Sequence, residues 1–392
     1  MIMRDDDYLL TVNAGSSSVK FTVFGAGNTN TEVFHASVEN IGQSSSRSMV
    51  NGAVESVNVA THAIAASLLI DALVKEIPLS SIVAVGHRIV HGGPDYYRPQ
   101  LVTPQLLKDL QGLTAFDPEH LPAQLSLIKT FLQQLPSVVQ VVCFDTAFHH
   151  DLPAPARLLP IPRHFAAAGI RRYGFHGLSY DFIVTELRRV EGDVAASGKV
   201  IIAHLGSGAS LASLKDGKSV DTTMGMTPAS GIPMSTRSGD LDPGLVLYLQ
   251  QTQGYSPDRF NHMVNFESGL LGISETTADM KKLLEIEDRD ERAREAIELF
   301  CYQVRKSIGG LAASLGGLNT LVFTGGMGEN APKIRAKICE GLEFLGVELD
   351  ETQNKQGARL ISARTSRTGV HVIRTNEAVT IARQTSEIIS SK

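Results

Sequence analysis

The sequence predicts a mixed α/β protein built from two domains. Strand-like stretches recur along the chain, and helical patterns lie between several of them. The 392 residues exceed what one ordinary hydrophobic core supports, so we expect two domains. One plan also occurs twice, because "LLTVNAGSSSVKFTVF" and "VIIAHLGSGASLASLKDG" both contain an apolar strand, a Gly/Ser turn and a second alternating strand.

The expected strands share apolar or alternating runs of four to eight residues. They cover residues 8–13, 19–24, 82–86, 138–144, 199–204, 209–214 and 320–324. We expect residues 42–60, which are rich in Ser and Asn, to form a surface connection or a hairpin. Residues 151–162 hold four prolines and are predicted to connect the two halves of the chain.

Two helices are indicated by apolar residues at spacings of three and four. The clearest lies within residues 290–316 and leads to the strand "TLVF". Its expected apolar face consists of Ala293, Ile297, Cys301, Val304, Ile308, Leu311 and Leu315. A second helix is expected near residues 61–75, with Ile64, Leu68 and Ala72 on its apolar side.

Composition excludes several classes of protein. The net charge is −5 and no long basic run occurs, so we expect neither a nucleic-acid partner nor an anionic membrane surface. The three cysteines are widely spaced and form no C-x-x-C pattern, which favours a reducing cytoplasm over a disulfide framework or a zinc site. No signal peptide and no run of about 18 apolar residues is found, so a membrane span is not expected.

Three Gly-rich turns follow expected strands, in "NAGSSSVK", "HLGSGAS" and "TGGMGENA". Such turns expose backbone N–H groups and hydroxyls that can donate hydrogen bonds to phosphoryl oxygens. In the first turn Asn13, Ser16, Ser18 and Lys20 alternate, so that several can point to the same side. Neither a Walker-type loop nor a G-x-G-x-x-G after the first strand is present. Nucleotide binding explains the three turns better than coincidence between hydroxyl-rich turns.

Two arginines lie in polar loops that contain glycine. Arg88 in "GHRIVHGG" and Arg237 in "STRSGDLDPG" could each bind a carboxylate or a phosphoryl group through two N–H donors. Alternatively, Arg88 is a surface residue and Arg237 stabilises its own loop by pairing with Asp240 or Asp242.

One acidic residue and one histidine are further candidates for the functional site. Asp145 follows the end of an expected strand, and together with a distant partner such as Glu377 it would be sufficient to bind Mg²⁺. Alternatively, Asp145 caps a turn. His176 lies between an aromatic residue and a glycine and is a candidate, although a lone histidine is usually structural. We expect His149 to face solvent.

A carboxylic acid substrate is ionised at neutral pH, so its phosphorylation needs cations rather than a base.

Eight motifs in register resemble the signatures of the acetate kinase family with its propionate and butyrate kinase relatives, from residue 8 to about 383. They are "VNAGSSSVKF", "GHRIVHGG", "CFDTAFH", "RRYGFHG", "HLGSGAS", "STRSGDLDP", "FTGGMGEN" and "RTNEA". The resemblance implies the two-domain actin-like ATPase fold of sugar kinases, Hsp70 and actin, with duplicated βββαβαβα-type domains, an interdomain cleft and a homodimer. It places the domains at 1–147 plus 378–392 and at 148–377, and implies reversible transfer from ATP to acetate, giving acetyl phosphate and ADP, with Mg²⁺ or alternatively Mn²⁺.

The resemblance also implies roles for individual residues. Arg88 and Arg237 would bind the substrate carboxylate and stabilise the transition state, and His176 would hydrogen-bond the transferred phosphoryl group. Asn13 would lie nearest that group, and Asp145 and Glu377, with Asn13, would belong to the metal site. The nucleotide would be bound by three sets of residues: Ser16, Ser18 and Lys20; His204, Gly206, Ser207 and Gly208; and Gly325, Gly326, Gly328 and Asn330.

The acyl pocket implied by the resemblance contains Val90, Phe116, Glu119, His120 and Phe175. Glu119 departs from the apolar residue common in the family, and we expect its loop to turn it outward while Phe116 supplies the wall. Val90 favours acetate over propionate, since an apolar pocket discriminates one methylene by about 1–3 kcal/mol. Further departures are Ser207, Ala378 and Met280. The alternatives are a propionate or other short-chain acyl kinase of the same family, a sugar or polyol kinase with Asp145 as base, and a nucleotide-sensing protein without turnover.

Overall fold

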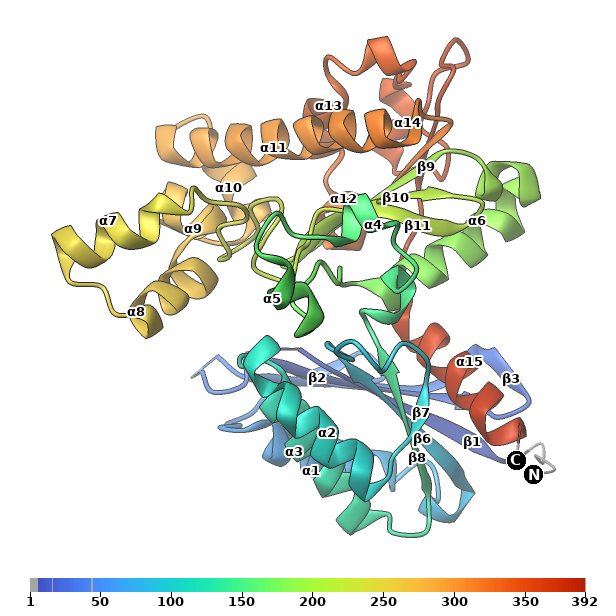
Figure 1. Cartoon of the computed structure of the whole chain (residues 1–392). Coiled ribbons are helices and arrows are strands. Elements are labelled where there is room, and N and C mark those ends of the chain that lie inside the picture. Colours follow the sequence, from blue (N-terminus) through green and yellow to red (C-terminus); the bar gives the residue numbers. More distant parts are fainter. Residues whose placement is uncertain (1–5, 16, 44, 392) are drawn as a thin grey trace. The chain divides into compact units, whose positions relative to one another are not determined.

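The computed structural model describes residues 6–15, 17–43 and 45–391, and these form two compact units (Figure 1). Unit 1 contains Met1–Ala147 and Asn376–Lys392, and unit 2 contains Phe148–Thr375. The sequence prediction had placed Asn376 and Glu377 with the second domain. The structure groups them with unit 1 because helix α15 (Glu377–Ser390) packs on strands β1 (Tyr8–Ala14) and β6 (Ile82–Ile89).

Unit 1 is built on an eight-stranded sheet in the order β5-β4-β3-β2-β1-β6-β8-β7. The strands from β1 to β5 pair antiparallel in sequence order, whereas β1, β6 and β8 are parallel. The carboxyl ends of these three parallel strands therefore meet at one edge of the sheet. The remaining strands are β2 (Ser18–Gly25), β3 (Asn28–Glu39), β4 (Arg47–Val50), β5 (Ala53–Ser56), β7 (Gln100–Leu101) and β8 (Val139–Phe144).

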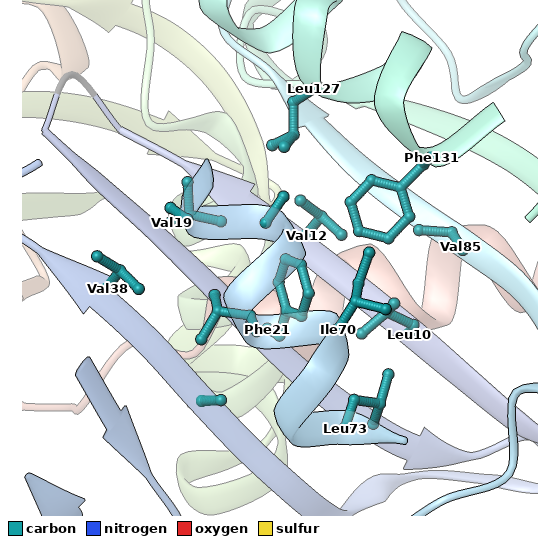
Figure 2. Packing of buried hydrophobic residues seen from close by; sticks show 14 of the residues in the cluster. Leu10, Val12, Val19, Phe21, Val38, Ile70, Leu73, Val85, Leu127 and Phe131 are labelled. Carbon is teal, nitrogen blue, oxygen red and sulfur yellow. The ribbon is translucent and has the colours of Figure 1, made fainter. Parts of the chain in front are cut away.

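Helices cover both faces of this sheet. Helices α1 (His62–Leu73) and α3 (Leu121–Gln134) pack over a core that contains Phe21 and Phe131 (Figure 2). Helix α15 lies so close on the other face that a Cβ at Gly86 would stand only 2.2 Å from Thr385 Oγ1. Helix α2 (Pro104–Gly112) packs beside α3.

The predicted apolar face of α1 is correct in part, because Leu68 and Ala72 are partly buried and pack against the core. The structure buries Ala65, Ala66, Leu69, Ile70 and Leu73, and leaves Ile64 48% exposed. The helix offers two apolar stripes at helical spacing, and the buried stripe contains two alanines, whose small side chains let the helix approach the sheet closely.

Unit 2 contains a five-stranded sheet in the order β11-β10-β9-β12-β13. Its pairings repeat those of β3-β2-β1-β6-β8 in unit 1: antiparallel neighbours on one side of the first strand and parallel neighbours on the other. Its strands are β9 (Val200–Leu205), β10 (Ala209–Lys215), β11 (Lys218–Thr222), β12 (Thr320–Thr324) and β13 (Gly369–Val372). The repeated Gly/Ser plan of the sequence is thus the first hairpin of each sheet, β1–β2 and β9–β10.

Two long helices flank the sheet of unit 2, α6 (Gly177–Ser197) and α11 (Glu291–Leu315). The predicted apolar face of α11 is confirmed, since Ala293, Ile297, Cys301, Val304, Ile308, Leu311 and Leu315 are all buried. Gly325–Asn330, expected as a turn, forms the short helix α12. The other helices are α4 (Ala154–Arg157), α5 (Arg163–Ala167), α7 (Gly244–Gln253), α8 (Pro257–His262), α9 (Gly269–Ser274), α10 (Met280–Ile286), α13 (Pro332–Cys339) and α14 (Glu351–Gln356).

The seven strands expected from the sequence correspond to β1, β2, β6, β8, β9, β10 and β12, and the hairpin expected within 42–60 is β4–β5. Short helical segments complete the chain at Leu79–Ser81, Leu113–Phe116, Ala147–His149, Met263–Glu267 and Glu343–Leu345. In the part of the chain that the structure describes, no helix has the length and apolar character needed to cross a membrane.

Candidate active site

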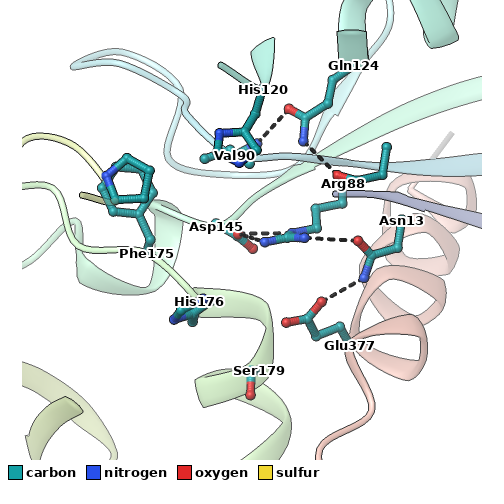
Figure 3. Close-up of polar contacts among 12 residues, drawn as sticks. Asn13, Arg88, Val90, His120, Gln124, Asp145, Phe175, His176, Ser179 and Glu377 are labelled. Carbon is teal, nitrogen blue, oxygen red and sulfur yellow. Dashed lines mark hydrogen bonds and ion pairs between the residues drawn. The ribbon is translucent and has the colours of Figure 1, made fainter. Parts of the chain in front are cut away.

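In unit 1, three predicted site residues meet at the carboxyl ends of β1, β6 and β8 (Figure 3). Arg88 near the end of β6 donates from Nε (2.9 Å) and Nη2 (2.6 Å) to Asp145 Oδ2, just beyond β8. Arg88 Nη1 also donates to Asn13 Oδ1 on β1 at 3.0 Å. The guanidinium is therefore fixed in orientation by two neighbouring strands.

Glu377 extends this set of contacts. Asn13 Nδ2 donates to Glu377 Oε2 at 2.7 Å. Glu377 begins α15, and the preceding residue, Asn376, caps that helix by accepting from Val379 N. The result is a continuous chain of polar contacts, Asp145–Arg88–Asn13–Glu377, assembled from four segments far apart in the sequence.

The electrostatics of this chain follow from burial. Asp145 is fully buried, which raises its pKa to about 6 although the ion pair with Arg88 opposes the shift; the Glu377 carboxylate adds to it. Burial disfavours the charge on Arg88, but the Asp145 and Glu377 carboxylates outweigh it and raise the pKa of Arg88. Arg88 is a permanent cation between two acids.

The residues around Arg88 fit a magnesium ion. Asp145 Oδ1 is buried and has no hydrogen-bond partner among the described residues, and the Glu377 carboxylate is close enough to disfavour ionisation of Asp145. A hard divalent cation held by one or two carboxylates and several waters would relieve both conditions. No group of three or more His, Cys, Asp or Glu suited to a metal occurs in the described residues, and Mg²⁺ does not require one.

The first hairpin places Lys20 directly across from Asn13 in the β1–β2 register, with Ser18 two residues earlier on the same face of β2. Lys20 is exposed and Ser18 is half-buried. Ser16, the third predicted phosphate contact in this turn, lies outside the described residues.

Val90, the first candidate acyl-pocket residue of unit 1, lies two residues after Arg88 in the chain. Val90 is buried, and its N–H donates to Gln124 Oε1 at 3.0 Å, while Gln124 Nε2 donates to Ala14 O at 3.1 Å. Gln124 on α3 thus joins the segment after β6 to the end of β1 (Figure 3). Sequence reasoning missed Gln124, because an amide in an amphipathic helix gives no signal of its own.

The loop before α3 carries the other three pocket candidates. His120 Nδ1 lies 2.9 Å from Oδ1 of the buried Asp117. The ring of Phe116 contacts the ring of His91 with centroids 5.2 Å apart. Glu119 is half-buried, and its turning away from a bound acid stays a prediction.

In unit 2, Arg237 and His176 converge over the β9–β10 turn. A Cβ at Gly208 would lie 2.8 Å from Arg237 Nη2 and 3.2 Å from His176 Nε2. Glycine at this position therefore lets both cation and imidazole approach the backbone. Arg237 Nη1 donates to Pro228 O at 2.7 Å, whereas the suggested loop partners Asp240 and Asp242 accept from the backbone N–H groups of Gly231 and Gly244.

His176 and His204 form a stacked pair of imidazoles, with centroids 4.3 Å apart and planes 19° apart. Each ring is oriented by a hydroxyl: His176 Nδ1 lies 2.8 Å from Ser210 Oγ, and His204 Nδ1 lies 2.9 Å from Ser179 Oγ. His176 immediately precedes α6 in a left-handed conformation with φ 59°. Such a backbone is uncommon outside glycine and is a feature of functional sites.

His149 was expected to face solvent, and this prediction is wrong. Its ring is buried, Nε2 donates to Phe175 O at 3.1 Å, and Nδ1 accepts from Ser219 Oγ at 2.7 Å. Burial lowers the pKa of His149 to about 4, so it is a neutral structural support for Phe175. Phe175, the remaining pocket candidate, is itself buried in unit 2. The adjacent Gly174 leaves the space that the His149 ring fills.

The third Gly-rich segment is held by an acid that sequence reasoning missed. Glu329 Oε1 accepts from Gly325 N at 2.9 Å and from Thr375 N at 3.1 Å. Gly325 has φ +77°, and a Cβ there would lie 2.9 Å from the Leu205 carbonyl group, so α12 can begin directly against β9. Asn330 Nδ2 donates back to Gly326 O at 2.9 Å.

A cavity of about 650 Å³ in unit 2 lies within the volume range of small-molecule pockets. It brings together Gly206 and Ser207 of the β9–β10 turn, Gly326 and Asn330 of α12, and Met280 of α10. Ser207 and Met280, two of the positions where this sequence differs from the residues common in the family it resembles, therefore line the same cavity. Gly328 is buried within α12 against β9.

Solved structures resemble this chain over nearly its whole length. A propionate kinase from Francisella tularensis subsp. tularensis SCHU S4 is 34% identical with a TM-score of 0.91, covering 97% of this chain and 99% of that one. The acetate kinase of Porphyromonas gingivalis is also 34% identical, with a TM-score of 0.86, covering 98% and 100%. The two sheets with repeated pairings and these likenesses define a kinase of the actin-like ATPase fold class.

The sequence comparisons identify the family. Residues 8–383 match the model of the acetokinase family, and the chain belongs to that family. An acetate kinase of Nitrobacter hamburgensis is 44% identical over 399 residues, covering 98% of this chain and 96% of the relative. A propionate kinase of Escherichia fergusonii is 38% identical over 389 residues, covering 97% and 96%.

Proposed function

We propose that this chain is an acetate kinase that transfers the γ-phosphoryl group of ATP to acetate reversibly, giving acetyl phosphate and ADP in the presence of Mg²⁺. The observation that carries the proposal is Arg88, a guanidinium fixed by Asp145 and Asn13 at the carboxyl edge of three parallel strands, in a chain of the acetokinase family. Carboxylate binding is the chemistry to which a rigid guanidinium is suited.

The mechanism follows from the charge of the acceptor. Acetate is ionised at neutral pH, so no side chain needs to remove a proton before the attack. A carboxylate oxygen attacks the γ-phosphorus in line, and the bond from that phosphorus to the β,γ-bridging oxygen breaks as ADP leaves. Arg88 would orient the acetate, while Arg237 and His176 would donate to the oxygens of the transferred group and stabilise its charge.

Asp145, Glu377 and Asn13 would hold Mg²⁺, or Mn²⁺ as an alternative, directly or through waters. Bound with the nucleotide, the ion neutralises charge on the phosphates. Asp145 and Glu377 supply the oxygen atoms, and Arg88 keeps Asp145 Oδ2 occupied so that Oδ1 is the oxygen available to an ion or its waters.

The nucleotide would lie in the cavity of about 650 Å³, with its phosphates at the β9–β10 turn and its adenosine at α12. Ser207 and Gly208 would offer backbone N–H groups to the phosphates, whereas the Gly206 N–H donates to Gly208 O at 3.1 Å and shapes the turn. His204 lies one residue before the end of the preceding strand, β9. Ser207 is shorter than the asparagine common in the family, so we expect its contact to pass through water.

Trapping with hydroxylamine tests the proposal. With ATP and Mg²⁺, acetate should yield acetyl hydroxamate, whereas a sugar kinase that uses Asp145 as a base would give none. Parallel assays with propionate and butyrate test the acid preference, because relatives of both names match this chain. Buried Val90 leads us to expect acetate as the preferred acid and longer acids as slow substrates.

We also propose a homodimer and a cytoplasmic location. Leu247 and Tyr248 on α7 are 56% and 59% exposed, and Tyr302 on α11 is 58% exposed, which supports a face of unit 2 covered by a second copy. The three cysteines are buried and none of them is in a disulfide, which supports a reducing compartment. Light scattering after size-exclusion chromatography tests the dimer: a mass near 42.2 kDa at micromolar concentration would contradict it.

A further inference from the structure

A buried chain of hydroxyl groups ends on His176 in unit 2. Tyr180 Oη lies 2.6 Å from Ser210 Oγ, and Ser210 Oγ lies 2.8 Å from His176 Nδ1. Tyr180 is on the first turn of α6, Ser210 is on β10, and neither side chain is exposed. The distances alone allow hydrogen bonds to run in either direction along this chain.

The number of hydrogens fixes the direction. If His176 Nδ1 donated to Ser210 and Ser210 donated to Tyr180, the phenol hydrogen would need another acceptor. The part of the chain that the structure describes provides Tyr180 Oη with no polar partner besides Ser210. If Ser210 accepted from both neighbours, its own hydroxyl hydrogen would have no acceptor among the described residues. A buried donor without an acceptor is unfavourable, so Tyr180 donates to Ser210 and Ser210 donates to His176 Nδ1. The imidazole proton is then on Nε2.

The state of the phenol agrees with this direction. Burial raises the pKa of Tyr180 further than the hydrogen bond with Ser210 lowers it. Tyr180 therefore keeps its hydrogen throughout the range in which histidines titrate. A protonated His176 would donate from both nitrogens, so Ser210 would accept from both of its neighbours and its own hydroxyl hydrogen would have no acceptor among the described residues.

The groups around His176 also disfavour a positive charge on its ring. Those that face this chain of hydroxyls within unit 2 are Arg237, which converges with His176 over Gly208; His204, which stacks on His176; and His149, whose ring lies 5.4 Å from that of Tyr180. Arg237 is a permanent cation, and the ring precedes the N-terminus of the long helix α6, where the helix dipole is positive.

We propose that Tyr180 and Ser210 are positioning residues that hold His176 as a neutral imidazole with its proton on Nε2. This inference rests on the proposed role of His176 at the transferred phosphoryl group. Nε2–H and the Arg237 guanidinium then point two donors at one region above Gly208, where a phosphoryl oxygen accepts from both. His176 donates a hydrogen bond there and neither gains nor loses a proton.

Nitrogen-15 NMR of the full chain reads this state directly. Histidine-labelled protein is compared with His176→Gln to assign the His176 ring, and spectra are recorded from about pH 6 to about pH 8, where an ordinary histidine titrates. We expect wild-type His176 to remain neutral with Nε2 protonated. Tyr180→Phe removes the hydroxyl that donates to Ser210, so His176 should also populate the tautomer with its proton on Nδ1. Its affinity for a second proton should rise about threefold to tenfold, which corresponds to the net free energy of one hydrogen bond.

Tyr173→Phe is the matched control, since it also removes a buried phenol hydroxyl, one that donates to Gly169 O at 2.6 Å. Its His176 signal and the pH profile of its kcat should match the wild type, whereas the acidic limb for Tyr180→Phe should move up by as much as about one pH unit. Ser210→Ala breaks the chain at its middle and provides a second variant should Tyr180→Phe fail to fold.

A wild-type ring protonated on Nδ1 would overturn the inference, and so would identical His176 spectra for Tyr180→Phe and Tyr173→Phe. The spectra require no turnover. A failure to form acyl phosphate therefore counts against the proposed function alone.

Discussion

Replacing Asp145 by Asn tests the part of the site that holds Arg88. The amide keeps the shape of the side chain and one acceptor oxygen but removes the charge that receives both the Nε and the Nη2 hydrogen bonds of Arg88. Removing one partner of a buried ion pair costs about 3–5 kcal/mol. The lower end applies here, because the change also relieves the repulsion between Asp145 and Glu377. We therefore expect the free energy of unfolding to fall by about 3 kcal/mol.

Catalysis should fall as well, because Arg88 loses one of its two anchors. A guanidinium that is free to rotate no longer presents two N–H groups to the acid, and we expect kcat/KM for acetate to decrease about 100-fold, or about 2.7 kcal/mol of transition-state stabilisation. Urea unfolding and hydroxamate formation under the same buffer measure the two effects. Asp109→Asn is the control, because Asp109 on α2 accepts from Tyr96 and Gln105 and takes no part in the site.

A double variant makes the reasoning refutable. Removing both charges with Arg88→Met in the Asp145→Asn background should restore part of the lost stability, since no unpaired charge then stays buried. The reasoning fails if Asp145→Asn is as stable as the wild type, or if the double variant is less stable than Asp145→Asn alone.

Three further predictions follow from single contacts. Gly208→Ala places a methyl group 2.8 Å from Arg237 Nη2 and should lower kcat about 10-fold or more with little change in unfolding temperature, and an unchanged kcat would contradict the convergence over Gly208. His149 is buried with its pKa lowered from 6.5 to about 4, so its contribution to the free energy of unfolding is fully present above about pH 6.5 and is lost as the pH falls toward 4. In His149→Gln, the free energy of unfolding measured in urea should fall by about 2 kcal/mol less between pH 7 and pH 5 than in the wild type. The same pH dependence in the variant and the wild type would refute this. Val90→Ala should raise kcat/KM for propionate relative to acetate about 10-fold, and steady-state rates that keep the wild-type ratio would remove Val90 from the pocket wall.

Local sequence patterns were sufficient for seven strands, the β4–β5 hairpin and α11, because alternation and helical spacing report burial directly, but they did not predict β3, β7, β11 and β13. For α1 they gave only the edge of the buried face, because two apolar stripes lie side by side and contact with the sheet decides which one is buried more deeply. The repeated arrangement of strand, Gly/Ser turn and strand could be recognised in the sequence because each copy is one contiguous hairpin, β1–β2 and β9–β10.

Part of the candidate site could also be predicted from local sequence patterns. Arg88 and Asp145 stand near Gly or at strand ends, where polar residues are conspicuous. Gln124, Ser210 and Glu329 gave no such signal. Their importance comes from partners that are distant in the chain, 110 residues away for Gln124, 34 for Ser210 and 46 for Glu329. His149 was misjudged because two adjacent histidines resemble a polar surface, and only the packing of Gly174 and Phe175 buries the first of them.

The central claim is that the ionised acid itself attacks phosphorus, and an isotope experiment tests it most directly. Acetate labelled with ¹⁸O in both oxygens is incubated with ATP, Mg²⁺ and the protein, and the acetyl phosphate is cleaved at its carbonyl carbon by hydroxylamine. We predict that the released phosphate carries one ¹⁸O atom from acetate. Phosphate without ¹⁸O would show that an acetate oxygen did not form the new bond to phosphorus and would contradict the account.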